Sequence, residues 1–126
     1  GSIATLLKLC GPTIELDEAQ FDAATAISGC GPAFVALFAQ ALIRAGENNG
    51  LEKNTAKMLA VQTIFGTAKL LGEENLEPEA IIEMVSSPAG ATVAGRKILQ
   101  EKEFGKILRE AVGAAMKRSE EMGKDG

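Results

Sequence analysis

The segment PAFVALFAQALIRAG, residues 32–46, most constrains the fold, because it is apolar on nearly every side of a helix. Its large apolar residues are Phe34, Val35, Leu37, Phe38, Leu42 and Ile43, and only Gln40 and Arg44 interrupt them. A helix that is apolar all round is buried all round. A chain of 126 residues can cover few helices in this way. The segment therefore indicates either a well-packed monomeric bundle or a chain that associates with another copy.

Helical patterns cover most of the remaining sequence, so we predict an all-α fold. Asp17 is a plausible N-cap for a helix over residues 17–28, and the GCGP run at 29–32 is expected to break the helix before the next one starts near Pro32. Further helices are predicted to begin at about residues 52–54, 78, 90 and 104. The helix that begins at about residues 52–54 has an apolar stripe of its own. Gly66 lies within it and is costly unless another helix packs closely there.

The first sixteen residues differ from the rest. Residues 3–11 are typical of the last turns of a short helix, and Gly1 and Ser2 are typical of a cloning remnant. Residues 12–16, PTIEL, are the only strand-like stretch. A single strand cannot satisfy its own backbone groups. Either this stretch is not a strand, or its sheet lies in something absent from this chain.

Composition excludes several classes of function. The net charge is −4 and no block of basic residues occurs, which argues against a nucleic-acid partner. With two cysteines, Cys10 and Cys30, and no histidine, neither a zinc site nor a Ser–His nucleophile pair is expected. We find no secretion signal and no apolar run of about 20 residues without a polar break. We therefore expect reduced thiols, a cytoplasmic location and no membrane span.

The stretch VSSPAGATVAG, residues 85–95, has no charge and almost no bulk. A helix starting near Gly90 would present unpaired backbone N–H groups and the positive end of its dipole, which bind anions. Ser87 and Thr92 could add hydroxyl donors, and the lack of any nearby Lys or Arg favours a small, singly charged group such as a carboxylate over a phosphate. Alternatively, Ser86 or Ser87 simply caps the helix, or the stretch is a plain connection between helices.

Three segments resemble one family, pyrroline-5-carboxylate reductase. SSPAGATVAG is similar to the family signature Ser-Pro-Gly-Gly-Thr/Ala-Thr, and DAATAISGCGPAF at 22–34 resembles its DAVTALSGSGPAY segment. AVQTIFGTAKLL at 60–71 is similar to a third family segment. The three occur in the family's order, and the resemblance runs from about Leu6 to Met122.

The resemblance implies a fold and a domain division. The chain is similar to the C-terminal half of a family member, in which helices of two subunits form an interlocked dimer. Residues 1–16 would then be the end of a Rossmann domain, with PTIEL its last strand, and residues 17–126 would be the dimerisation and substrate domain. A homodimer, or a higher assembly of dimers, is the implied oligomeric state.

The resemblance also implies a reaction and a site. Family members reduce 1-pyrroline-5-carboxylate to L-proline by hydride transfer from NADPH or NADH. By similarity, Ser87 and the backbone N–H groups of Ala91 and Thr92, with Gly90 beside them, hold the substrate carboxylate. The Thr92 hydroxyl would lie near the ring nitrogen and assist proton delivery. Nothing in the sequence matches the dinucleotide motif Gly-x-Gly-x-x-Gly, so we expect this chain alone to bind no cofactor and to be inactive.

Two residues depart from the family pattern. Ala89 replaces the first signature glycine, which would cost about 1 kcal/mol if that position requires a positive φ. Cys30 stands where the family often has serine, and we interpret it as a small packing residue. Two rival interpretations remain: a standalone helical dimerisation module without a ligand, and the helical half of a different reductase.

Overall fold

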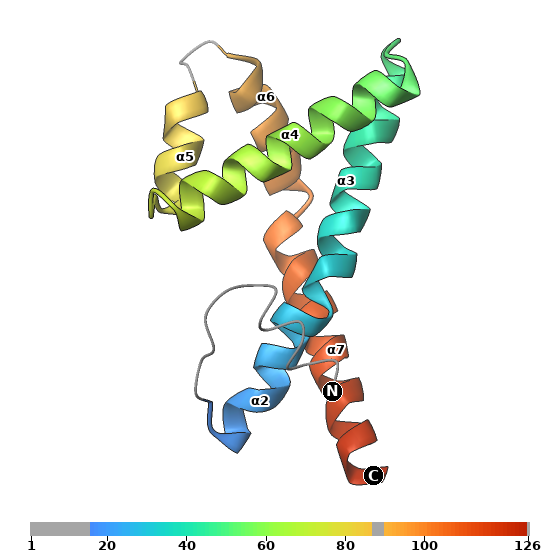
Figure 1. Ribbon diagram of the computed structural model, residues 1–126, viewed down its shortest axis with the longest axis vertical. Coiled ribbons are helices and arrows are strands. Elements are labelled where there is room, and N and C mark those ends of the chain that lie inside the picture. The colour runs from blue at the N-terminus through green and yellow to red at the C-terminus, as the bar shows by residue number, and fades with distance from the viewer. Residues whose placement is uncertain (1–15, 87–89, 126) are drawn as a thin grey trace. The chain divides into compact units, whose positions relative to one another are not determined.

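A computed structural model describes residues 16–86 and 90–125, and these form helices joined by short turns (Figure 1). The elements are α2 (Glu18–Ala24), the π-helical turn η1 (Thr25–Gly29), α3 (Gly31–Asn48), α4 (Lys53–Gly72), α5 (Pro78–Val85), α6 (Ala91–Glu101) and α7 (Phe104–Asp125). No strand occurs among the described residues. The all-α prediction is confirmed for this part of the chain.

The predictions for the N-terminal segment lie almost entirely outside the described residues. These are the helix ending at Gly11, the strand over 12–16 and the domain remnant over 1–16. Leu16 is the one described residue among them, and it has no regular secondary structure. The division of the chain at residue 17 therefore stays a prediction.

Helix α2 begins as predicted, and the chain is interrupted near the predicted position. The Asp17 carboxylate accepts a hydrogen bond from the Gln20 N–H at 3.0 Å, which is an N-cap contact. The following turn widens into η1, where the Cys30 N–H donates to the Thr25 carbonyl five residues earlier at 3.2 Å. The predicted break at GCGP is a bend at Cys30, and α3 begins at Gly31, next to the predicted start at Pro32.

One helical segment bears on the expectation of no membrane span. Residues Gln20–Asn48 form a helical segment of 29 residues with a mean hydropathy of 1.7 in its most apolar 18-residue window, which by length and composition alone could cross a membrane. The segment contains polar breaks, among them Asp22, Gln40 and Arg44, so the expectation of no membrane span stays a prediction.

The junction between α3 and α4 is a Schellman motif, which explains why the chain reverses there. The Leu51 N–H donates to the Gly46 carbonyl at 3.0 Å, and the Gly50 N–H donates to the Glu47 carbonyl at 3.1 Å. Gly50 has φ +98°, a conformation that other residues rarely adopt. The Asn49 side chain also donates to the Ala45 carbonyl at 2.8 Å. These bonds satisfy carbonyls at the end of α3 and fix the start of α4.

The chain divides into two compact units, one made of Gly1–Val35 with Glu103–Gly126 and the other of Ala36–Lys102. In the first unit, α2 and η1 contact α7. Ala26 of η1 is buried, and the Ser119 hydroxyl of α7 donates to the Asp22 carboxylate of α2 at 3.0 Å. This hydrogen bond and the buried methyl group connect segments that lie 97 residues apart in the sequence.

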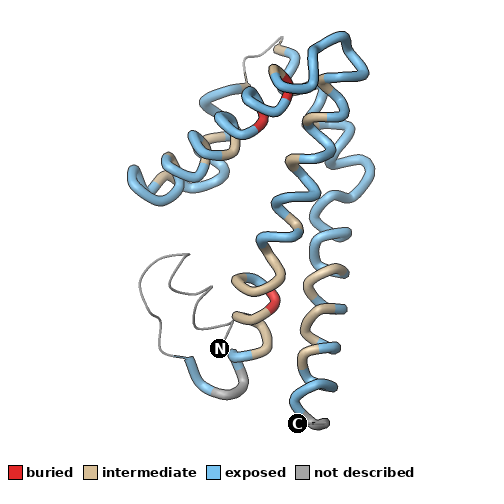
Figure 2. Tube along the Cα trace, turned by 45° about the vertical axis from the view of Figure 1, so that its right-hand side comes forward, coloured by how far each residue is buried: buried red, intermediate tan, exposed pale blue. Residues whose placement is uncertain are grey.

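In the second unit, α4 contacts α5 and lies across the end of α3. Its buried residues are Ala56 and Ala60 of α4. Many large apolar residues of this unit are exposed, among them Leu37, Phe38, Leu42, Met58, Leu59, Val61 and Phe65. Figure 2 colours most of the described chain as exposed. Within the described part of the chain, three alanines are the only buried residues.

Candidate functional site

The first turn of α6 lies at the predicted position. Gly90 is the N-cap residue, with φ −82° and ψ 160°, and the helix begins at Ala91. Ser86 ends the preceding helix α5, where its N–H donates to the Glu83 carbonyl at 3.2 Å. The interpretation of Ser86 as the cap of α6 is therefore wrong, because glycine occupies the cap position. Ser87 and Ala89 lie outside the described residues.

The Ser86 hydroxyl is the one buried polar side-chain atom for which no hydrogen-bond partner is found in the described part of the chain. A buried hydroxyl without a partner is unfavourable. Sequence reasoning gave Ser86 only the role of a cap. The signal that it differs from an ordinary serine appears only once the burial of its oxygen is known.

Gly90, Ala91 and Thr92 follow one another at the start of α6, as predicted for the carboxylate site. Ala91 and Thr92 are exposed, and Gly90 is partly buried. The N–H groups of a first helical turn have no carbonyl partner within the helix. Together with the positive end of the helix dipole, they favour an anion at this position. The small side chains of Gly90 and Ala91 leave access to these N–H groups.

The expectation that no Lys or Arg lies near this turn is wrong, because Arg96 lies in the next turn of α6. Arg96 follows Thr92 by four residues, so the two share a face of α6, and helical side chains lean toward the N-terminus. The ion pairs of the described residues involve other cations, namely Lys69, Lys106 and Arg118. Arg96 therefore adds positive potential near the first turn of α6. Among the described residues no cluster of acidic, cysteine or histidine side chains could hold a metal ion.

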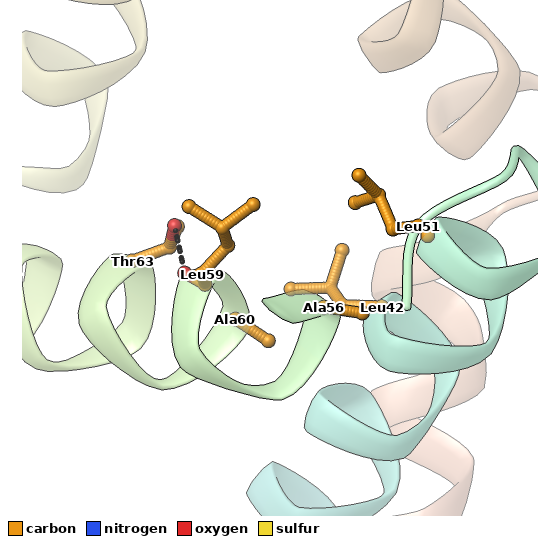
Figure 3. Close-up of a pocket in the computed structure, with 7 residues that line it drawn as sticks. Leu42, Leu51, Ala56, Leu59, Ala60 and Thr63 are labelled. Atoms are coloured by element: carbon orange, nitrogen blue, oxygen red, sulfur yellow. Dashed lines mark hydrogen bonds between the residues drawn. The ribbon is translucent and has the colours of Figure 1, made fainter. Parts of the chain in front are cut away.

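A hollow lies between α3 and α4, and its chemistry differs from that of the first turn of α6. It is an open cavity of about 180 Å³ lined by Leu42, Gly46, Leu51, Ala56, Leu59, Ala60 and Thr63 (Figure 3). Gly46 allows the close approach of the two helices, since a Cβ atom there would lie 3.1 Å from the Ala56 Cβ. The Thr63 hydroxyl donates to the Leu59 carbonyl at 2.7 Å within α4. We call this hollow the α3–α4 pocket.

Comparison with known proteins identifies relatives along nearly the whole chain. A family model described as pyrroline-5-carboxylate reductase dimerisation matches residues 18–122. A pyrroline-5-carboxylate reductase of Synechocystis is 44% identical over 114 residues, which cover 90% of this chain and 43% of that protein. One from Corynebacterium melassecola is 43% identical over 122 residues, covering 97% of this chain and 45% of that protein. The chain thus spans less than half the length of these relatives.

Solved structures agree with the sequence relatives. A pyrroline carboxylate reductase of Plasmodium falciparum with NADP bound is similar with a TM-score of 0.84 and 39% identity, over 90% of this chain and 46% of that one. A pyrroline-5-carboxylate reductase of Coxiella burnetii gives a TM-score of 0.84 and 34% identity, over 88% of this chain and 42% of that one. The chain belongs to the pyrroline-5-carboxylate reductase dimerisation family.

Proposed function

We propose that this chain is the dimerisation and substrate-carboxylate domain of an enzyme that reduces 1-pyrroline-5-carboxylate to L-proline with NADPH or NADH. The observation that carries the proposal is the family match over residues 18–122. The uncharged first turn of α6 lies within that match and has the backbone geometry of an anion site. A standalone dimerisation module would not need an accessible helix N-terminus of this kind.

In this proposal the residues of α6 bind and orient the substrate. The N–H groups of Ala91 and Thr92 and the Ser87 hydroxyl hold the carboxylate, and Gly90 leaves room for it. A carboxylate held at this turn fixes the position of the pyrroline ring, because the carboxyl group is attached directly to the ring. The Thr92 hydroxyl then lies near the ring nitrogen and assists the delivery of a proton to it. Positioning of this kind accounts for a large share of the rate acceleration in many enzymes.

The described residues do not fit a dinucleotide. They contain no glycine-rich turn between a strand and a helix, which is the usual cradle for the pyrophosphate. The nicotinamide supplies the hydride in the full-length enzyme, and its binding site belongs to a Rossmann domain of which residues 1–16 would be the last part. Accordingly, this chain by itself would bind no NADPH and would not turn over the substrate.

The same proposal covers the assembly and the cellular location. The working unit is a homodimer, which could associate further into an assembly of dimers, and it acts on a small molecule in the cytoplasm without nucleic-acid or membrane partners. The exposed apolar residues of α3 and α4 support self-association.

Steady-state kinetics of the full-length enzyme test the substrate site. Thr92→Ala and Ser87→Ala each remove a hydrogen bond to a charged group, worth about 1.5–3 kcal/mol. We expect each to raise KM for the pyrroline substrate about ten- to a hundredfold and to leave KM for the cofactor almost unchanged. A lower kcat for Thr92→Ala would support its role in proton delivery.

Thr67→Ala is the matched control, because the Thr67 hydroxyl donates to the Thr63 carbonyl within α4. It should leave both Michaelis constants as they are. If Ser87 only caps a helix, Ser87→Ala would lower the melting temperature without any change in KM. Unchanged KM in both site variants would refute the carboxylate site.

A further inference from the structure

The turn between α3 and α4 contains a chemically reactive dipeptide, Asn49–Gly50. The backbone nitrogen of the residue after an asparagine can attack the carbonyl carbon of the asparagine side chain, which makes asparagine one of the heat-labile residues. A side chain on that next residue hinders the attack, and glycine has none. Of the asparagines in the sequence, Asn48, Asn49, Asn54 and Asn75, only Asn49 precedes glycine. Such a reaction is therefore expected first at Asn49.

The fold keeps this dipeptide at an exposed position. Asn49 and Gly50 are both exposed, at the turn that joins the ends of the two helices (Figure 1). Gly50 has φ +98°, which a residue with a Cβ atom adopts only with strain. The Asn49 side chain donates to the Ala45 carbonyl at 2.8 Å and thereby satisfies a carbonyl at the end of α3. Both residues are thus needed for the turn, although together they are reactive.

Two hydrogen bonds restrain the reacting groups while the turn is folded. The Gly50 N–H donates to the Glu47 carbonyl at 3.1 Å, so the attacking nitrogen is engaged. The Asn49 amide is held on the Ala45 carbonyl. The nitrogen and the side-chain carbon can meet only after these bonds open. Because helix ends open more readily than helix centres, the rate of reaction would report opening at the end of α3.

We propose that Asn49 is a site of spontaneous deamidation and that the two hydrogen bonds of the turn set its rate. The Gly50 nitrogen loses its proton and forms a bond to the side-chain carbonyl carbon of Asn49, whose bond to the amide nitrogen breaks with release of ammonia. Water then hydrolyses the resulting succinimide at one of its two carbonyl carbons. The products are aspartate and isoaspartate at position 49, and no oxidant or reductant is involved. This inference goes beyond the proposed function and does not depend on it.

The product disturbs the end of α3. The amide that donates to the Ala45 carbonyl becomes a carboxylate, which has no proton to donate at neutral pH. Its negative charge lies at the C-terminal end of a helix, where the helix dipole disfavours it, and near the carboxylates of Glu47 and Glu52 in the sequence. Isoaspartate also adds one atom to the main chain and so alters the spacing of the backbone hydrogen bonds. We expect the modified turn to be less stable.

The remaining asparagines are less reactive for a local reason, and they serve as references within the same molecule. Asn54 lies in the first turn of α4 and precedes the β-branched Thr55. Asn75 precedes Leu76, which has a bulky side chain and whose N–H is hydrogen-bonded. Both asparagines are exposed, so exposure alone would not distinguish them from Asn49.

Incubation of the folded protein at mildly alkaline pH, followed by peptide mass spectrometry, tests the site. Deamidation replaces an amide NH2 group with a hydroxyl group, so the peptide that contains residue 49 should gain one mass unit. The protein should become more acidic by one charge on isoelectric focusing. We expect this gain at Asn49 before any gain at Asn54 or Asn75, and fragmentation of the peptide separates Asn49 from Asn48. Conversion of another asparagine first, or no conversion at Asn49, would overturn the proposal.

A comparison with the unfolded chain tests the control by the turn. In denaturant we expect Asn49 to convert about ten- to a hundredfold faster than in the folded protein, because two hydrogen bonds of ordinary strength no longer have to open. Leu51→Ala should also speed the conversion. The Leu51 side chain lies close to Gly46, since a Cβ atom at Gly46 would be 3.2 Å from it, and its loss loosens the turn without changing the reacting residues. Equal rates in the folded and unfolded protein would show that the turn does not set the rate.

Asn49→Gln is the matched control, because it keeps a side-chain amide but would have to close a six-membered ring, which forms more slowly. We expect no mass gain at position 49 and unchanged behaviour of the other asparagines. Asn49→Asp introduces the carboxylate from the start. It should melt about 4 °C below Asn49→Gln, since it lacks the donor and adds a charge at the end of α3. Equal melting temperatures of the two variants would refute the expected effect of the modification on the turn.

Discussion

The first turn of α6 and the α3–α4 pocket are both uncharged and built largely from small residues, yet they present opposite chemistry. At Gly90 and Ala91 the small side chains leave backbone N–H groups accessible to an anion. At Gly46 and Ala56 they allow two helices to approach closely, and the hollow there is lined mainly by leucine and alanine side chains. Small residues therefore have two uses in this chain. Next to free backbone N–H groups they give access to an anion, and next to another helix they allow close packing. We propose the first region for a small carboxylate, whereas the second is an apolar hollow.

Gly90→Val in the full-length enzyme should show the largest difference between the two regions, because it should affect substrate binding and not the dimer. A branched side chain at the N-cap blocks the approach to the N–H groups, so we expect KM for the pyrroline substrate to rise more than a hundredfold, beyond the effect of Thr92→Ala. The dimer should keep its affinity, because the α3–α4 pocket is unchanged. Kinetics beside equilibrium sedimentation measures both. Loss of the dimer with an unchanged KM would reverse the assignment of the two regions.

Gly66→Ala distinguishes a solvated face of α4 from a face packed against a partner by the sign of its effect. On a solvated helix, alanine is more favourable than glycine by about 1 kcal/mol. If a helix of the second copy packs closely at Gly66, the added methyl group overpacks the contact and costs about 1–3 kcal/mol instead. We expect destabilisation, measured by denaturant unfolding at one fixed protein concentration. A stabilised variant would show that this face of α4 is exposed to water in the dimer.

Ser119→Ala provides a reference for the size of an effect within one chain. It removes the hydrogen bond to the Asp22 carboxylate, which joins α7 to α2 within the other compact unit. We expect a loss of about 1 kcal/mol in the free energy of unfolding. KM for the substrate should not change. A larger loss would mean that this contact supports the dimer as well as the single chain.

Arg96→Gln should have the smallest effect of the series. The guanidinium is partly exposed and acts on an anion at the first turn of α6 mainly through its charge. We expect KM for the substrate to rise about two- to fivefold at low ionic strength, since partly exposed charges contribute less than about 1 kcal/mol. The rise should vanish at high salt. An effect that persists in high salt would indicate a direct hydrogen bond from Arg96 to the substrate.

Local chemistry explains what the sequence predicted correctly. Asp17 caps α2 through its own side chain, Pro78 lies in the first turn of α5, and Gly90 stands before α6. Each start depends on neighbouring residues alone. The exposure of large apolar residues on α3 agrees with one of the two alternatives left open for residues 32–46, a chain that associates with another copy.

Interactions between distant residues explain what the sequence did not predict. The GCGP run predicts the interruption at Cys30, but it does not predict that the turn leading to it, Thr25–Gly29, is a π turn. The α3–α4 pocket depends on the close approach of Gly46 to Ala56, which no local pattern reveals. Likewise, the buried and unpartnered hydroxyl distinguishes Ser86 only after α5 and its surroundings have formed.

The number of residues in the π turn η1 determines how α3 is rotated about its own axis. Such a turn holds one more residue than a regular helical turn, and each residue of an α-helix rotates the next by about 100°. Deleting one residue within Thr25–Gly29 would turn the whole of α3 by about that angle relative to α2 while keeping every one of its side chains. The leucine and phenylalanine side chains of α3 would all be present, but they would contact different residues. An insertion or deletion in this turn would therefore rotate the apolar face of α3. A shortened turn would damage the protein more than most substitutions along the same helix.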